Sequence, residues 1–285
     1  MYFDENAGIL FRTKYAVMDI LGAPRIAYNS IFLIEKDAAN LIVYAIPVMI
    51  ICTLVEFAFS KYHNKKNYDI QETIGSVFIG IGNVAINLLF KIGLLYGVVF
   101  IYNLVPWRMA ANWWTIIPCL ILFDFCSYWS HRISHYIRFF WATHVVHHTA
   151  EHYNLSVSFR MSWVQHIKII FFLPIAALGF HPLIFFIANQ VSVLFQFWQH
   201  TESIRKLNSF VENLIVTPSN HRVHHGSNEK YLNENFGAIF IVWDKIFGTY
   251  QQEEQKPTYG ITKNISKTLN PLILNFHEFK VMILM

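Results

Sequence analysis

The residues of this sequence best suited to chemistry are histidines in three short patterns. One pattern is HxxxH and two are HxxHH, and together they comprise His131, His135, His144, His147, His148, His221, His224 and His225. On a helix, residues three or four apart share one face, so imidazoles at these spacings can point at one ion. Paired helical histidines recur in metal sites for this reason. The patterns therefore predict a metal centre built from separate parts of the chain.

Other uses of histidine compete with this interpretation. A single histidine near a membrane or in a core is more often a hydrogen-bonded residue than a ligand, and we interpret His63, His166, His181 and His277 in this way. Imidazoles also titrate near neutral pH and can form a pH switch. Eight clustered imidazoles, however, would repel one another when protonated unless a metal kept them neutral. Because eight exceed the ligands of one ion, we expect two ions.

The composition is that of an integral membrane protein. Of the 285 residues, 54% are hydrophobic and only 14% are charged, and Phe, Tyr and Trp number 26, 14 and 8. Such aromatic content is typical of lipid-facing surfaces and interfacial belts. The net charge of +4 is too diffuse to indicate a nucleic-acid partner. Cys52, Cys119 and Cys126 lie in apolar runs without CxxC spacing, which indicates packing residues.

The apolar runs predict an all-α membrane bundle with about four transmembrane segments. These segments are residues 41–59, 76–105, 115–128 and 169–197, the last broken into a hairpin at Gly179-Phe180-His181-Pro182. Residues 1–40 are expected to form interfacial or loosely packed helix, and residues 220–235 are the most loop-like part. We divide the chain into N-terminal membrane segments, residues 1–129, and a histidine-rich catalytic region, residues 130–285, that includes the hairpin.

The positive-inside rule sets the expected orientation. The loop after the first span carries Lys61, Lys65 and Lys66, which indicates the cytoplasmic side. All three histidine patterns then lie on that same face, in a cytosolic helical cap of a multi-pass membrane protein. Basic residues before the first span, such as Arg25, would lie on the opposite side. Either the N-terminal segment rests on the membrane surface or the first crossing is misassigned.

The residues around the histidines resemble those of a known family. The series HxxxH, HxxHH, a single downstream histidine and a final HxxHH resembles the fatty acid hydroxylase (sterol desaturase) superfamily of membrane di-iron oxygenases. The stretches HHTAEHYNLS from His147 with Arg160, WQHTE from Trp198, and WDKIFGT from Trp243 resemble its alkylglycerol monooxygenase branch and bacterial relatives. The resemblance covers roughly residues 124–262. It implies a small transmembrane bundle with a cytosolic part that holds the metals.

The resemblance implies nine iron ligands, namely the eight patterned histidines and His200. His200 rests on the resemblance alone, because its spacing is that of an ordinary interfacial histidine. His152 has no counterpart among the ligands, and we interpret it as a polar surface residue.

Polar neighbours should orient the imidazoles through their free N–H groups. Asp124 and Tyr128 precede His131 by seven and three residues and can share its helix face. A carboxylate inside an apolar run is costly unless it has a partner, which strengthens the case for Asp124. For the residues near the other patterns, the alternative is a solvated loop side chain. The candidates are Asp124, Tyr128, Glu151, Asn154, Glu202 and Asn220.

These features predict an iron-dependent lipid monooxygenase that uses O2 to hydroxylate a C–H bond. At a carbon next to an ether oxygen the product is a hemiacetal, which breaks down to an aldehyde, so alkyl ether cleavage is one such reaction. Hydroxylation or desaturation of a sterol or fatty acyl chain is the alternative within the superfamily. A metal transporter, a haem cytochrome and a structural zinc protein are alternatives of other classes. A transporter should hold its ligands within the spans.

Two electrons must come from outside the chain. The sequence contains no Gly-rich fingerprint for flavin or nicotinamide and no four-cysteine iron–sulfur set. We therefore expect an electron-donor protein or a small reductant. Alkylglycerol monooxygenases typically carry an acidic residue directly after HxxxH, and here that position is Tyr136. If that acid takes part in the use of tetrahydrobiopterin, Tyr136 argues against this reductant, which the resemblance otherwise implies.

Overall fold

The computed structural model describes residues 22–38, 41–262 and 265–284, and this part of the chain is helical. Over these residues the only β-type contact is an isolated bridge between Ile215 and Phe240. The predicted all-α class is therefore confirmed. The α-helices are α1 Ile31–Asp37, α2 Leu41–Tyr62, α3 Ile70–Leu104, α4 Trp113–Tyr136, α5 Arg138–Ala142, α6 Val145–His148, α7 Leu173–Ala177, α8 Pro182–Phe197, α9 Ser209–Leu214, α10 Pro218–His225, α11 Val242–Ile246 and α12 Pro271–Ile283. The 3-10 helices are η3 Tyr28–Ser30, η4 Leu155–Phe159, η5 Gln165–Phe171 and η6 Glu229–Tyr231.

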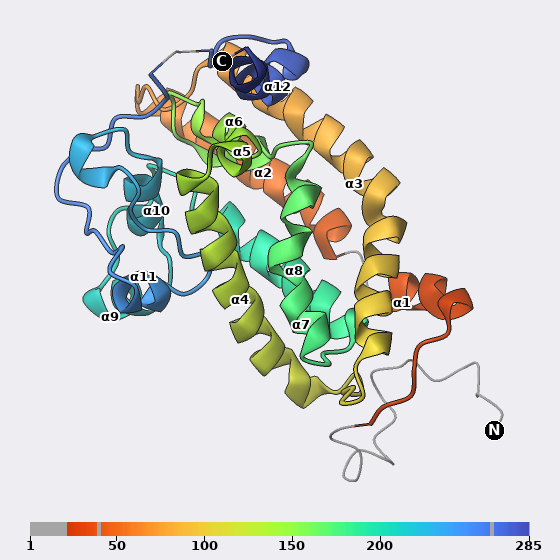
Figure 1. Ribbon diagram of the computed structural model, residues 1–285. Coiled ribbons are helices and arrows are strands. Elements are labelled where there is room, and N and C mark those ends of the chain that lie inside the picture. Colours follow the sequence, from red (N-terminus) through yellow and green to blue (C-terminus); the bar gives the residue numbers. More distant parts are fainter. Residues whose placement is uncertain (1–21, 39–40, 263–264, 285) are drawn as a thin grey trace.

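The long helices form one layer and the short C-terminal helices another. In Figure 1, α3 and α4 run along opposite flanks, with α7 and α8 between them. Helices α9, α10 and α11 gather beside the upper half of α4, and α12 crosses the end where α3 begins. The residues expected to form spans and those expected to form the site therefore occupy different parts of the molecule.

Apolar packing between α4, α7 and α8 forms the main core. Phe123 of α4 contacts Phe185 of α8 with ring centroids 5.6 Å apart, and Cys119 and Cys126 lie buried in the same cluster. The prediction that these two cysteines are packing residues is confirmed. This core fixes α4 against α8, and so fixes the position of the two histidines near the end of α4.

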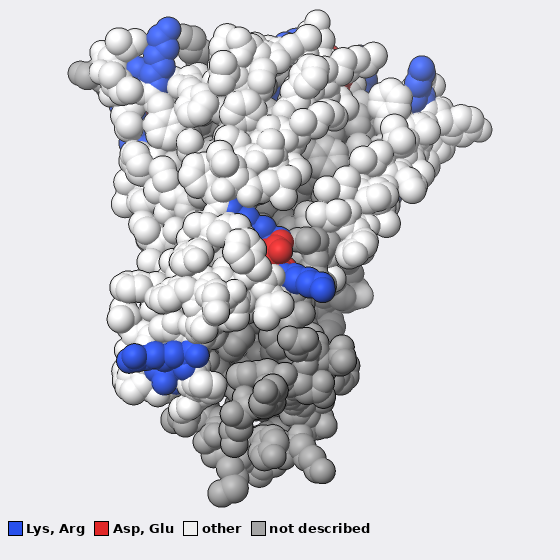
Figure 2. All heavy atoms as spheres, turned by 90° about the vertical axis from the view of Figure 1, so that its right-hand side faces the viewer, with Lys and Arg blue, Asp and Glu red and all other residues white. Residues whose placement is uncertain are grey.

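Two helical stretches have the length and composition to cross a membrane, one ending at Tyr62 and the other α3. Asp69 begins α3 by accepting a hydrogen bond from the backbone N–H of Glu72 at 3.0 Å. Along α2 and α3 many large apolar side chains are exposed, among them Val48, Ile51, Leu88 and Leu89. Figure 2 shows few charged side chains on the described part of this face, with basic groups near its upper and lower ends and basic and acidic side chains together at its middle. The exposed apolar side chains of α2 and α3 suit contact with lipid.

The break expected within residues 169–197 is present. Helix α7 ends at Ala177 and α8 begins at Pro182. Gly179 between them has a φ of +86°, and a Cβ there would lie 2.2 Å from the carbonyl oxygen of Trp107. The break therefore depends on a residue without a side chain at a point where two backbones touch.

Two other expectations concern the segment before α1 and the residues from 220 onward. The described residues before α1 lie at the turn after α3: the N–H of Ile26 donates to Asn103 Oδ1 at 2.8 Å, and Arg108 donates to the carbonyl of Ala23. That turn is at the opposite end of α3 from the Lys61 loop. The prediction of a loop over residues 220–235 is wrong for residues 220–225, because these residues form most of α10. Residues 1–21 and 39–40 of the predicted interfacial segment lie outside the described residues.

A contact at Gly82 on α3 gives a test of this packing. A Cβ at Gly82 would lie 2.2 Å from the indole ring of Trp163, whose Nε1 donates to the carbonyl of Ile79 at 3.0 Å. We expect Gly82→Ala to lower the free energy of unfolding by about 1–3 kcal/mol, because the Trp163 ring must move. Thermal unfolding of the protein in detergent measures this change.

Gly93→Ala on the same helix is the matched control, because nothing lies within 4 Å of a Cβ there. Alanine alone favours a helix by about 1 kcal/mol over glycine, so this variant should be neutral or more stable. Equal transition temperatures for both variants would contradict the packing of Trp163 on Gly82.

Candidate metal centre

Nine histidine side chains meet in two adjoining groups at the end of α4. In each group every histidine offers a ring nitrogen that lies within 4.8 Å of the others. The five-histidine cluster is His131, His135, His144, His148 and His224, and the four-histidine cluster is His147, His200, His221 and His225. The structure thus brings together all nine residues named from the sequence, including His200. His63, His152, His166, His181 and His277 lie in neither cluster.

The doubled histidines of the two HxxHH patterns divide between the clusters. His224 belongs to the five-histidine cluster and His225 to the four-histidine cluster, and His148 and His147 divide in the same way. Adjacent residues on a helix point about 100° apart, so neighbouring imidazoles cannot serve one ion from one face. On α10, His221 and His225 are four residues apart and therefore share a cluster. Each doubled pattern contributes to both clusters.

Local sequence explains why α10 can present three imidazoles. Thr217 begins the helix by accepting a hydrogen bond from the N–H of Asn220, and Pro218 occupies the first helical position. Gly226 ends it directly after His225. In the second pattern, His144 is the residue before α6, not a member of that helix.

The ring nitrogens within each cluster approach one another closely. The Nε2 atoms of His131 and His144 are 2.9 Å apart, and those of His147 and His225 are 3.1 Å apart. Two further buried ring nitrogens, Nε2 of His135 and of His224, have no hydrogen-bond partner in the described part of the chain. Buried polar atoms without partners are costly. Nitrogen atoms that converge in this way fit bound metal ions.

Burial keeps these imidazoles in the form that binds metal. Removal from water lowers the pKa of His200 and of His224 to about 4, although backbone carbonyls partly oppose the shift. Burial, reinforced by neighbouring histidines, also lowers the pKa of His147, His221 and His225 well below the usual value of a histidine. At pH 7 the rings are therefore neutral, and a metal need not displace protons.

Backbone carbonyls orient several of the rings. His131 Nδ1 lies 2.9 Å from the carbonyl oxygen of Phe236, and His200 Nδ1 lies 2.9 Å from that of Gln196. His224 Nδ1 lies 3.1 Å from the carbonyl oxygen of Glu234. These contacts leave the Nε2 atoms of the three rings facing the clusters. Residue types carry no signal for such contacts, so sequence reasoning missed them.

Asp124 acts one step away from the histidines. Its carboxylate accepts hydrogen bonds from the N–H groups of Ile239 and Phe240, at 2.7 and 3.0 Å, and from Nε1 of Trp243. Asp244 accepts from the N–H groups of Phe236 and Gly237 at 2.6 and 2.7 Å. The two carboxylates thus hold the loop whose Phe236 carbonyl orients His131.

Tyr128 belongs to the same support. Its hydroxyl is 2.9 Å from Thr249 Oγ1 and accepts a hydrogen bond from Arg132. Thr249 in turn donates to Asp244. Tyr128 therefore contacts the groups that hold the loop of Phe236.

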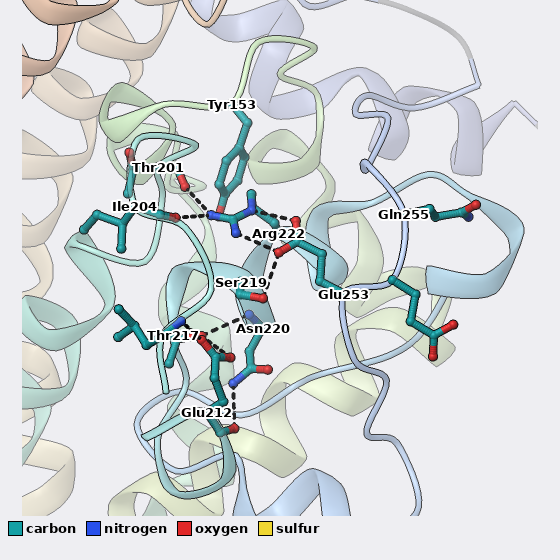
Figure 3. A network of polar contacts seen from close by, with 12 residues as sticks. Tyr153, Thr201, Ile204, Glu212, Thr217, Ser219, Asn220, Arg222, Glu253 and Gln255 are labelled. Carbon is teal, nitrogen blue, oxygen red and sulfur yellow. Dashed lines mark hydrogen bonds and ion pairs between the residues drawn. The ribbon is translucent and has the colours of Figure 1, made fainter. Parts of the chain in front are cut away.

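Asn154 and Asn220 bind backbone groups. Asn154 donates to the carbonyl of Asn67 at 2.7 Å, and Asn220 donates to that of Glu212 at 3.1 Å. Figure 3 shows the side chain of Asn220, which belongs to α10, directed toward Glu212. Both asparagines join segments that carry cluster histidines to the rest of the molecule.

Glu151 and Glu202 line a cavity of about 520 Å³ at the surface. The wall of this cavity toward the clusters is Tyr153, whose ring is stacked on Tyr259 and lies 5.0 Å from the ring of His225. The two glutamates therefore face a space separated from the histidines by an aromatic layer.

Buried charged residues that the sequence analysis passed over also fix the site. Glu56 of α2 accepts hydrogen bonds from the N–H of Leu155 and the hydroxyls of Tyr68 and Thr201. Arg222 of α10 forms a double hydrogen bond with Glu253 and donates to the carbonyls of Thr201 and Ile204, as Figure 3 shows. A carboxylate within an apolar run was a usable signal for Glu56. Arg222 offered only its place between histidines.

Comparison with known proteins agrees with this site. A family model for Fatty acid hydroxylase matches residues 116–249. An alkylglycerol monooxygenase of Homo sapiens is 40% identical over 62% of this chain and 39% of that protein, and one of Caenorhabditis elegans is 34% identical over 75% and 43%. An ornithine lipid hydroxylase of Rhizobium tropici is 23% identical over 56% of this chain and 49% of that protein. No solved structure matches significantly.

The matched region contains both histidine clusters. The family model begins within α4 and ends just after α11, so it includes all nine cluster histidines and Asp124. The chain spans about two fifths of the length of the alkylglycerol monooxygenases it matches. The order of the histidine patterns and the match over residues 116–249 show that this region of the chain is similar to the fatty acid hydroxylase family.

Proposed function

We propose that this protein is a membrane-bound, O2-dependent lipid monooxygenase whose two histidine clusters each hold one iron ion. The observation that carries the proposal is the division of nine imidazoles, seven of them buried and two half-buried, into sets of five and four, with no carboxylate among them. Imidazole ligands suit iron, and a structural zinc ion would need only four ligands. A pair of iron ions, when bound, supplies redox chemistry that inserts an oxygen atom from O2 into a C–H bond.

The chain's own contribution is to fix the ligands and keep water out. The rings of His144, His147, His148, His200 and those on α10 are buried, which keeps them neutral and their site dry. Asp124 and Asp244 hold the loop that orients His131, and Arg222 holds α10 against the segment after His200. Rigid support of this kind preserves the spacing of a metal pair.

The clusters argue against a transporter. They lie near the end of α4 and on α6 and α10, whereas a transporter binds its cargo near the middle of its spans. We propose that residues 115–128 and the 169–197 hairpin enter the membrane with α2 and α3, giving about four segments. The clusters then lie in a cap on the cytoplasmic face, because the Lys61 loop is at the same end of α3.

The substrate we propose is a membrane lipid with an alkyl ether bond, because the relatives at 34–40% identity are alkylglycerol monooxygenases. Hydroxylation of the carbon next to the ether oxygen would release an aldehyde. Sterols and fatty acyl chains are the alternative substrates. The two electrons come from an external donor protein or a reductant such as tetrahydrobiopterin.

Metal content gives a direct test. Anaerobic reconstitution with Fe(II) should load two iron ions per chain, measured by elemental analysis after desalting. His221→Ala leaves three imidazoles in the four-histidine cluster and should reduce the content to about one ion. His148→Ala leaves four imidazoles in the five-histidine cluster and should therefore retain more iron than His221→Ala. His63→Ala, an exposed histidine outside both clusters, is the control. One ion in the unsubstituted protein would refute the two-ion centre.

Oxygen consumption tests the activity itself. The reconstituted protein, supplied with a chemical reductant, should consume O2 in the presence of an alkylglycerol lipid and release a fatty aldehyde detectable by mass spectrometry. His147→Ala and His224→Ala, one from each cluster, should each abolish turnover. A sterol or fatty acid that supports turnover when the ether lipid does not would favour the alternative substrates. Full activity in both alanine variants would sink the proposal.

Asp124→Asn tests the support of His131. An amide presents N–H groups toward backbone N–H donors, so the loop of Phe236 should loosen and metal affinity should fall by about 10–100-fold. Competition with a metal chelator measures this affinity. The control is Glu229→Gln, which removes a carboxylate from an exposed position. Unchanged affinity in Asp124→Asn would show that the loop does not control His131.

A further inference from the structure

Lys168 is a charged residue that no part of the proposed mechanism uses so far. It lies on η5, which packs between the long helices: Phe172 directly after η5 contacts Phe123 of α4, with ring centroids 4.5 Å apart, and His166 contacts Phe90 of α3 at 5.4 Å. Phe171 contacts Phe140 of α5 at 5.1 Å. The 3-10 helix is therefore wedged among apolar side chains.

The backbone places Lys168 on the side of η5 that faces α5. Side chains three residues apart lie above one another on a 3-10 helix, so Lys168 shares the ridge of Phe171, whose ring contacts Phe140 of α5. Helix α5 is the short link between His135 and His144, which both belong to the five-histidine cluster. Lys168 therefore lies on the side of η5 directed toward that cluster.

Lys168 has no acceptor within the described residues: no hydrogen bond or ion pair joins it to any of them. The nearby buried acids are engaged elsewhere, since Asp124 and Asp244 bind the loop of Phe236, and Glu72 binds the N–H groups of Glu151 and His152. Burial lowers the pKa of Lys168 to about 7, although its side chain keeps some accessible surface. Without an anion the amine is therefore partly neutral, and a bound anion would favour its ammonium form.

The charge of a metal-loaded centre also favours an anionic ligand. Nine neutral imidazoles would hold two divalent ions with no protein carboxylate to balance them. The positive field of two such ions is then increased by an ammonium on the adjoining helix. An anionic ligand is the simplest partner for this combination.

We propose that Lys168 binds an anionic oxygen group, a phosphate or a carboxylate, of the lipid substrate beside the metal centre. This inference rests on the proposed lipid oxygenase function and narrows its substrate to acidic lipids. Because the anionic group is then anchored close to the clusters, the oxidised carbon lies near the head group and not at the far end of the alkyl chain. Lys168 is thus a specificity-determining residue.

Ligand binding without turnover tests this inference. The protein loaded with zinc, which is redox-silent, is titrated in neutral detergent with dodecyl phosphate, dodecanoate and dodecanol by isothermal calorimetry. Lys168→Met should weaken binding of at least one of the two anions by about tenfold or more, as expected for a lost charge-assisted hydrogen bond. Dodecanol binding should not change. Loss confined to one anion identifies that group as the one recognised.

Two further variants separate recognition from folding. Lys168→Arg keeps the charge and should restore much of the anion binding. Lys280→Met removes an exposed lysine of α12 and should bind all three ligands as the unsubstituted protein does. Equal affinity of Lys168→Met and the unsubstituted protein for both anions would overturn the inference.

The outcomes also separate this inference from the oxygenase proposal. Anion binding that depends on Lys168, together with no O2 consumption by the iron-loaded protein, would support the lysine site and reject the oxygenase. O2 consumption with anion binding that ignores Lys168 would do the reverse.

Discussion

The structure depends on buried imidazole nitrogens that lie close together although their lone pairs repel one another. Imidazole nitrogens about 3 Å apart, such as those of His131 and His144, cannot all be satisfied by sharing hydrogens. Several buried nitrogens, including Nε2 of His135, have no partner in the described chain. Metal ions convert this cost into a gain, because each ion satisfies several lone pairs at once. Metal binding should therefore contribute to the stability of the fold around the clusters.

Charged groups outside the clusters hold the histidine-bearing segments in place. Asp124, Asp244 and Glu56 accept hydrogen bonds from backbone N–H groups of the loops beside the histidines. Arg222 ties α10 to the carbonyls that follow His200. Buried charges with complete sets of partners are rigid, because loss of any one bond leaves an uncompensated charge. The acids and bases of this chain act as braces, which leaves the ligand positions to imidazole alone.

Much of this arrangement could be predicted from residue types and spacing. The helical spacing of His131 and His135, the doubled histidines, and the break at Gly179 all report local geometry, which sequence encodes directly. His200 was different, because a single histidine has no spacing to distinguish it. It was identified only because the residues around it resemble those of a family. In the structure its Nε2 atom lies 3.1 Å from the Nε2 atom of His221.

What could not be predicted depends on contacts between distant segments. The polar run of α10 looked like a loop in the sequence. It is helical because Thr217 caps the helix and because its side chains are buried against the rest of the molecule. Asp124 looked like a direct partner of His131, but its acceptor oxygens meet a loop more than a hundred residues later. The group that orients His131 is the backbone carbonyl of Phe236, which is present in every residue type and so gives no signal in the sequence. Tertiary hydrogen bonds to backbone are invisible in a single sequence.

The position of the clusters relative to the apolar helices explains how a lipid and a polar metal site can meet. The histidines on α4 lie within three turns of the buried core that α4 forms with α8, so one helix joins the apolar and metal-binding parts. For the proposed lipid substrate, an alkyl chain that contacts the apolar part of this helix would have its head group near the histidines. Lys168 lies at that junction, on the helix between α3 and α4, and it has no acceptor in the described part of the chain. Burial alone would leave such an amine partly neutral, and an anionic ligand would hold it in its charged form.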